Sequence, residues 1–102
     1  MAQIMFNQPI INTFQDGSVK EQYYLLQGNK NGEYIQYYKD GSIKMKCNYI
    51  NGKLEGIYIS YWPNRKIHTL REYSDGKLKE RRFQMFNQDG KIIYDDNSCI
   101  IC

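Results

Sequence analysis

Residues suited to catalysis or metal binding are few in this 102-residue chain. His68 is the only histidine, so neither a histidine-based acid–base pair nor a multi-histidine metal site can form. Asp95 and Asp96 are adjacent, and neighbours on a strand point to opposite faces, so they make no carboxylate dyad. The sequence therefore predicts no catalytic residue, no metal site and no cofactor, and we expect the protein not to be an enzyme.

The three cysteines are too few for a disulfide framework. One is Cys47, and the other two lie in the terminal Cys99-Ile100-Ile101-Cys102. This segment fits a CxxC pair, a prenylation signal or an incidental apolar tail. The tail is favoured because no second CxxC exists and cysteine is not a usual last residue of a prenylation signal. Without a secretory signal in the first fifteen residues, we expect an intracellular, cytoplasmic protein, in the host cytoplasm or the virion if the source is viral.

The charge pattern does not indicate a polyanionic partner. The net charge is +3, and the densest basic stretch, residues 77–82, includes the acidic Glu80. Such a stretch is typical of a solvated strand edge, where lysines block unwanted pairing. Contact with phosphate is the alternative. We therefore expect no nucleic-acid partner, and membrane lipid stays a weakly supported alternative.

The sequence repeats itself every 24 residues. Residues 28–44 match residues 52–68 without a gap, with glycines, tyrosines, an aromatic pair and a turn in the same positions. Weaker copies lie on either side, and the last turn, Asp89-Gly90, arrives one residue late, which indicates one insertion. We expect a single domain over residues 1–102, with repeats roughly over 10–25, 26–49, 50–73 and 74–98 and a short tail over 99–102.

Turn signals and alternation predict strands throughout. Asp-Gly and Asn-Gly pairs favour type I′ hairpin turns, and they stand at Asp16-Gly17, Asn31-Gly32, Asp40-Gly41, Asn51-Gly52, Asp75-Gly76 and Asp89-Gly90. Side chains between the turns alternate with a period of two, and no segment shows helical spacing. The sequence thus predicts an all-β fold, a single-layer antiparallel meander of stacked β-hairpins, with strands over 10–14, 19–25, 33–38, 43–49, 57–62, 67–73, 81–86 and 91–94.

The repeat unit resembles the MORN repeat. The resemblance is carried by Gly28, Gly32, Tyr34, Tyr37, Tyr38 and Gly41 and, one repeat later, by Gly52, Gly56, Tyr58, Tyr61 and Trp62. It is most similar to the variant form in bacterial antitoxin-type proteins and in repeat proteins of large DNA viruses, and it covers about residues 10–94. The departures are Arg65 and Glu80, which stand where the pattern has glycine. The resemblance implies a repeat ribbon; MORN-like proteins have been linked to membrane lipids.

Superposing the repeats predicts which side chains share a face, and it puts His68 at the position of Lys44, a solvent-facing strand site. One face takes Ile35, Ile59 and Phe83 with Tyr37, Tyr61 and Met85; the other takes Tyr34, Tyr58 and Arg82 beside Tyr38, Trp62 and Phe86. Either one face folds over as a core while the tyrosines tolerate water, or the aromatic face is a surface for a partner or for self-association. The candidate binding surface comprises Tyr34, Tyr38, Tyr58, Trp62, Arg82 and Phe86.

The function expected from these features is that of a non-catalytic protein–protein interaction or scaffold module. The alternatives are an antitoxin or immunity protein that neutralises a cognate toxin, which only the resemblance suggests, and a peripheral phospholipid-binding module. If the aromatic face binds a partner, replacing Tyr34, Tyr58 and Trp62 together by serine should abolish association and leave the thermal midpoint little changed.

Overall fold

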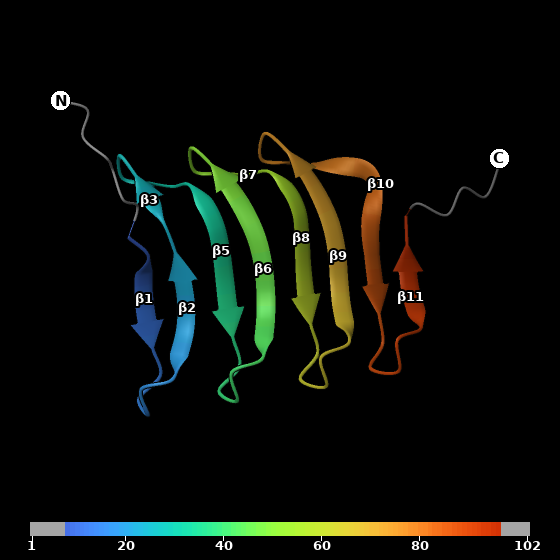
Figure 1. Cartoon of the computed structure of the whole chain (residues 1–102). Coiled ribbons are helices and arrows are strands. Elements are labelled where there is room, and N and C mark those ends of the chain that lie inside the picture. Colours follow the sequence, from blue (N-terminus) through green and yellow to red (C-terminus); the bar gives the residue numbers. More distant parts are fainter. Residues whose placement is uncertain (1–7, 97–102) are drawn as a thin grey trace.

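The computed structural model describes residues 8–96, which form an antiparallel all-β meander without any helix (Figure 1). Nine strands make one sheet, in which β1, β2, β5, β6, β8, β9, β10 and β11 follow one another and β7 pairs with β6. Two short strands, β3 and β4, pair separately. The strands are β1 (Ile10–Thr13), β2 (Val19–Tyr23), β3 (Leu25–Leu26), β4 (Asn29–Lys30), β5 (Gly32–Tyr37), β6 (Ile43–Ile50), β7 (Lys53–Leu54), β8 (Gly56–Tyr61), β9 (Ile67–Ser74), β10 (Lys77–Phe86) and β11 (Ile92–Asp95).

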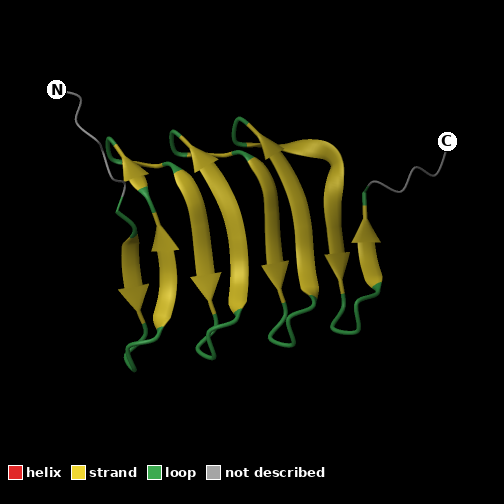
Figure 2. Ribbon diagram, viewed as in Figure 1, coloured by secondary structure: helices red, strands yellow, loops and turns green. Residues whose placement is uncertain are grey.

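The predicted fold class is confirmed. Each of the eight predicted strands overlaps an observed one, and these eight observed strands pair antiparallel, each with the next, in a single open layer (Figure 2). The smallest dimension of the molecule is only 17 Å. The short strands β3, β4 and β7 were not predicted; they lie in the turns that link one hairpin to the next.

The turns at the two ends of the strands differ. At the end where one hairpin is linked to the next, both Asn51 and Gly52 have positive φ (51° and 82°), as the predicted type I′ turn requires. At the opposite end, Gly41 has positive φ whereas Asp40 does not, and the Gly41 N–H donates to the Tyr38 carbonyl. This is a three-residue loop with a left-handed third residue, so the prediction of type I′ turns was wrong there. It was also wrong at Asn31-Gly32, because Asn31 lacks a positive φ and Gly32 begins β5; the two-residue turn lies at Gln27-Gly28, between β3 and β4.

Arg65 occupies the left-handed position of one such loop, where the other repeats have glycine. Its φ is +74°, against +90° at Gly17 and Gly41. A side chain at this position costs about 1 kcal/mol, because its Cβ crowds the backbone. The loop still closes as in the other repeats, with the Arg65 N–H donating to the Trp62 carbonyl. The surrounding repeat therefore imposes the turn on an unfavourable residue.

The extra residue of the last repeat lies inside β10. Leu78 stands opposite Tyr73 and Gln84 opposite Leu70, so β10 advances six residues while β9 advances three. In the preceding repeat the chain advances five residues, from Leu54 to Ile59, while the opposed strand also advances three, from Tyr49 to Lys46. Within this bulge Arg81 has a φ of +58°. The late Asp89-Gly90 turn had shown that one residue was inserted, and the structure places it ahead of Phe83. Every later side chain of β10 is consequently turned to the face opposite the predicted one.

The sheet has no enclosed core. Of the described residues, only Tyr34, Ile35, Cys47 and Thr69 are buried, and no described side chain is fully enclosed. Tyr34 and Ile35 are consecutive in β5 and point to opposite faces, so this strand has one buried side chain on each face of the sheet. A single layer can only half-bury its side chains, and both faces of this sheet consequently meet solvent over most of their area.

Candidate interaction surface

Cross-strand pairing sorts the side chains onto two faces. Tyr34 stands opposite Cys47, and Tyr58 stands opposite Arg71, which in turn stands opposite Phe83. Because directly opposed residues point the same way, these side chains share one face. We call it the tyrosine face; its aromatic members are Phe14, Tyr23, Tyr34, Tyr38, Tyr49, Tyr58, Trp62, Tyr73, Phe83 and Tyr94.

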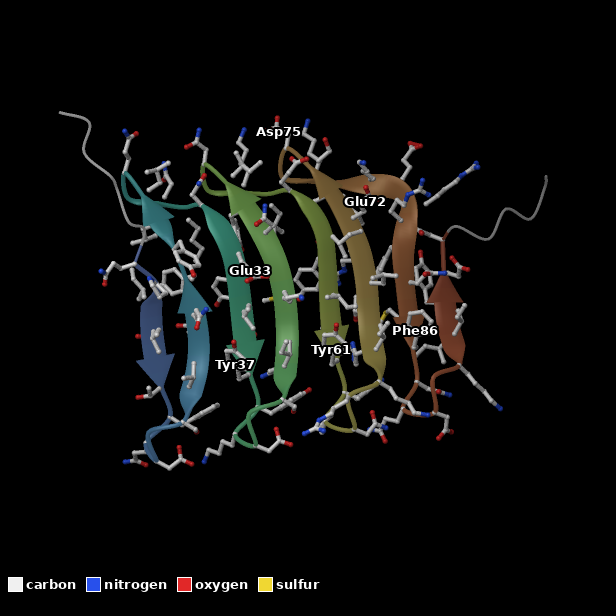
Figure 3. All side chains as sticks on the ribbon, viewed as in Figure 1. Glu33, Tyr37, Tyr61, Glu72, Asp75 and Phe86 are labelled. Atoms are coloured by element: carbon white, nitrogen blue, oxygen red, sulfur yellow. The ribbon has the colours of Figure 1, made fainter. Side chains whose placement is uncertain are left out.

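The other side of the sheet, which we call the isoleucine face, has aliphatic side chains beside polar ones such as Gln22 and Lys46. It includes Ile11, Ile35, Ile57, Ile59 and Leu70, which alternate with the tyrosine-face residues along their strands. Ile11 and Ile57 are about half exposed, at 49% and 52%. Figure 3 labels Tyr37, Tyr61 and Phe86, which share the equivalent strand-end position beside this row.

Tyr34 is the most buried aromatic residue of the tyrosine face. Its ring stacks on Tyr23 at 5.6 Å between centroids and meets the edge of Tyr49 at 5.9 Å. Its hydroxyl donates to Glu21 over 2.6 Å, and only 9% of the residue is exposed. Burial, together with the bond to Glu21, raises the pKa of Tyr34 to about 12. Hydrogen bonds from Tyr34 and Asn12 lower the pKa of Glu21.

Two cations, Lys30 and Arg71, each lie against more than one ring of the tyrosine face, and sequence reasoning missed both. The Lys30 ammonium lies 5.3–5.7 Å from the ring centroids of Tyr23, Tyr34 and Tyr49. The Arg71 guanidinium lies 5.2 Å from Tyr58 and 4.7 Å from Phe83. Distances below about 6 Å permit cation–π attraction.

Arg71 also donates from Nη1 to the Tyr73 hydroxyl, while its buried Nε has no hydrogen-bond partner. The only sequence signal was positional, since Arg71 takes the repeat position of Tyr23 and Cys47.

Tyr38 and Trp62 make the same contact one repeat apart. The Tyr38 hydroxyl donates to the Tyr61 carbonyl, and the Trp62 indole N–H donates to the Phe86 carbonyl, both in the following hairpin. A cation or imidazole lies against each ring: Lys44 over Tyr38 at 5.8 Å, and His68 against Trp62 at 4.1 Å. These rings therefore hold neighbouring hairpins together as well as lining the face.

His68 is half-buried, which corrects the expectation of a solvent-facing histidine. Its Nδ1 lies within hydrogen-bonding distance of the Thr69 hydroxyl and 3.4 Å from the Ser60 hydroxyl. The prediction had equated His68 with Lys44, which is correct by position. It did not foresee that a bulge before Tyr61 turns the side chain towards the tyrosine face, beneath Trp62.

Arg82 and Phe86 do not continue the tyrosine columns, so this part of the predicted surface is wrong. Phe83 follows Tyr58 in the column, because the inserted residue precedes it. Phe86 takes the position of Tyr61, and its place beside Trp62 is taken by Asn87. Arg82 lies on the opposite side, where its Nε pairs with Glu72 at 3.2 Å. Tyr34, Tyr38, Tyr58 and Trp62 do share one face.

The basic stretch at 77–82 forms part of the β10 bulge. Lys79 and Arg82 both pair with the Glu72 carboxylate, at 2.9 Å and 3.2 Å, and these ion pairs lower the pKa of Glu72. The pairs are exposed, so each contributes little to stability. These pairs link the bulge to β9, and two of the four basic residues here are neutralised locally.

Among residues 8–96 no cluster of three metal-ligating side chains occurs, and no helix in that range is long and apolar enough to cross a membrane. Cys47 is 3% exposed, and burial raises the pKa of its thiol to about 11, which leaves it unreactive near neutral pH. The terminal Cys99-Ile100-Ile101-Cys102, with the tail predicted over 99–102, lies outside the described residues.

Comparison with known proteins gives no relative: no family model, no curated protein and no solved structure matches this chain.

Proposed function

We propose that this chain is a non-catalytic repeat module of the MORN type that binds a protein partner on its tyrosine face. The observation that carries the proposal is the gathering of Tyr34, Tyr38, Tyr58 and Trp62 on one side of a single-layer sheet. Tyrosine and tryptophan, together with arginine, dominate the binding energy of protein interfaces, because they bury much area at a low entropic cost. The 24-residue period supports the MORN assignment.

A shallow hollow on this face suits an anchoring side chain. It has a volume of about 190 Å³, and Met45, Tyr58 and His68 are among the residues that line it. Tyr38 and Lys44 border the same hollow. Hot spots at interfaces are commonly side chains inserted into such aromatic-lined pockets. An apolar or aromatic side chain of the partner would fill this hollow.

Charge on the same face defines the partner further. Lys30, Lys44 and Arg71 all lie against its rings, whereas its carboxylate Glu21 is already bonded to Tyr34 and Asn12. The face is therefore positive overall. We propose a protein partner whose contact surface is apolar at its centre and acidic around it, which would be attracted at low salt.

Site-specific photocross-linking tests this proposal. Benzoylphenylalanine at Tyr58 points to the tyrosine face, and the same group at Ile57 is the matched control on the opposite face of the same strand. In an extract of the native source, position 58 should capture a defined protein, and capture should weaken as salt rises. Equal capture from position 57, capture of phospholipid alone, or no capture from position 58 would overturn the proposal.

A further inference from the structure

The sheet is assembled from hairpins through one joint that occurs three times. The second strand of each hairpin pairs with the first strand of the next, as β2 with β5, β6 with β8 and β9 with β10. The register is the same each time: Glu21 stands opposite Gln36, Met45 opposite Ser60, and Thr69 opposite Met85. The joint is therefore a property of the repeat and does not depend on one particular pair of side chains.

The two outermost strands are equivalent to the two strands that pair in each joint. β1 is the first strand of its hairpin and β11 is the second strand of the last hairpin, and in the described part of the chain each pairs with one neighbour only (Figure 1). One continuous row of opposed residues crosses the sheet; it begins at Asn12 in β1 and ends at Tyr94 in β11. The row comprises Asn12, Glu21, Gln36, Met45, Ser60, Thr69, Met85 and Tyr94.

These edges also have the composition of a pairing surface. Natural edge strands are usually protected by charged residues, yet β1 has the sequence Ile-Ile-Asn-Thr and carries no charge, and β11, Ile-Ile-Tyr-Asp, carries one charge, at its last residue. Large apolar side chains are exposed on both: 49% of Ile11 on β1, and 52%, 60% and 47% of Ile92, Ile93 and Tyr94 on β11. An uncharged strand with free backbone groups is a template for another strand.

We propose that copies of this chain join head to tail, with β11 of one copy pairing antiparallel with β1 of the next and Tyr94 opposite Asn12. This pairing repeats the internal register and continues the row from one molecule to the next. Because the two surfaces differ, the contact does not close on itself, and it generates an open-ended ribbon. The contact uses the edges of the sheet and leaves both faces exposed, so it does not rest on the function proposed above.

The intermolecular joint should be weaker than the internal ones. Internal joints are linked through the chain, and two of them carry the hydrogen bonds from Tyr38 and Trp62 to the next hairpin. At the last hairpin Asn87 has this position, and its side-chain oxygen already caps its own turn by accepting from the N–H groups of Asp89 and Lys91. Association is therefore reversible and rises with protein concentration.

Disulfide trapping tests the register. In a variant with Cys99→Ser and Cys102→Ser, N12C and Y94C together should give a ladder of covalent multimers under mild oxidation, since opposed strand residues lie within disulfide reach. The matched control, N12C with I92C, is two residues out of register and should give far less. No ladder, an equal ladder from the control, or dimers of the single N12C variant would overturn the proposal.

Sedimentation of the otherwise unaltered protein provides the second measurement. Its weight-average mass should rise with concentration, and I11K should reduce that rise severalfold by placing a charge on the edge. The matched control is I57K, on the same face and equally exposed but in an interior strand. A mass that stays monomeric at all concentrations, or an equal effect of both variants, would overturn the proposal.

Discussion

The tyrosine face and the isoleucine face are made by the same strands, and neither is covered by a second layer, yet their side chains are arranged differently. On the tyrosine face, rings stack on rings, hydroxyls find partners, and Lys30 and Arg71 lie against the aromatic groups. On the isoleucine face, aliphatic side chains stand beside polar ones, with Ile35 between Gln22 and Lys46, and Ile57 is half exposed. The comparison shows that amphipathic rings can stabilise a face that water still reaches, because each ring has a polar end.

The largest expected difference between the faces is in stability. Replacing Tyr34 by alanine removes two ring contacts and the bond to Glu21, and it should lower the free energy of unfolding by about 3 kcal/mol. Replacing the half-exposed Ile57 by threonine should cost about 0.5 kcal/mol or less, because threonine keeps the β-branch. Urea unfolding followed by circular dichroism measures both.

Equal losses from these two variants would contradict the distinction between the faces. The expectation also revises the triple serine variant, in which Tyr34, Tyr58 and Trp62 were to change with little effect on the thermal midpoint. The burial of Tyr34 means that such a variant would lose structure as well as any partner. Loss of binding in that variant would then not identify a binding surface.

A smaller effect should appear at alkaline pH. The pKa of Tyr34 is raised to about 12 in the folded protein, above its usual value near 10, so the neutral hydroxyl is favoured by folding. The stability that this shift contributes is complete below about pH 10 and is lost as the pH rises towards 12. The Y34F variant lacks the titrating group, so its urea midpoint should fall less between pH 9 and 11 than that of the parent. Parallel curves for the two proteins would contradict the account of Tyr34.

The sequence was sufficient to predict the class of fold. A meander of hairpins is indicated by the 24-residue period, by the Asp-Gly and Asn-Gly turns and by strict alternation, and each of these signals is local. The site of the insertion could not be predicted in the same way. The distance from Arg65 to Gly90 counts the extra residue without locating it, and only the pairing of Phe83 with Arg71 shows where the bulge lies.

The candidate surface was predicted as far as it follows the regular repeats. Tyr34, Tyr38, Tyr58 and Trp62 come from the second and third hairpins, where the offset of 24 holds in space as in sequence. Arg82 and Phe86 come after the insertion, where one residue changes the face. The cations Lys30 and Arg71 were missed because a contact with rings on neighbouring strands depends on side-chain conformation, which the repeat pattern does not specify.

Side-chain relaxation enhancement by a soluble gadolinium chelate tests most directly that both faces of one layer are open. In NMR spectra of the dilute protein, the Ile57 methyl groups and the Tyr58 ring protons should both relax faster, while Tyr34 and Cys47 are protected. Protection of Ile57 or of Tyr58 to the same degree as Tyr34 would show a second layer over that face, and the single-layer account would be wrong.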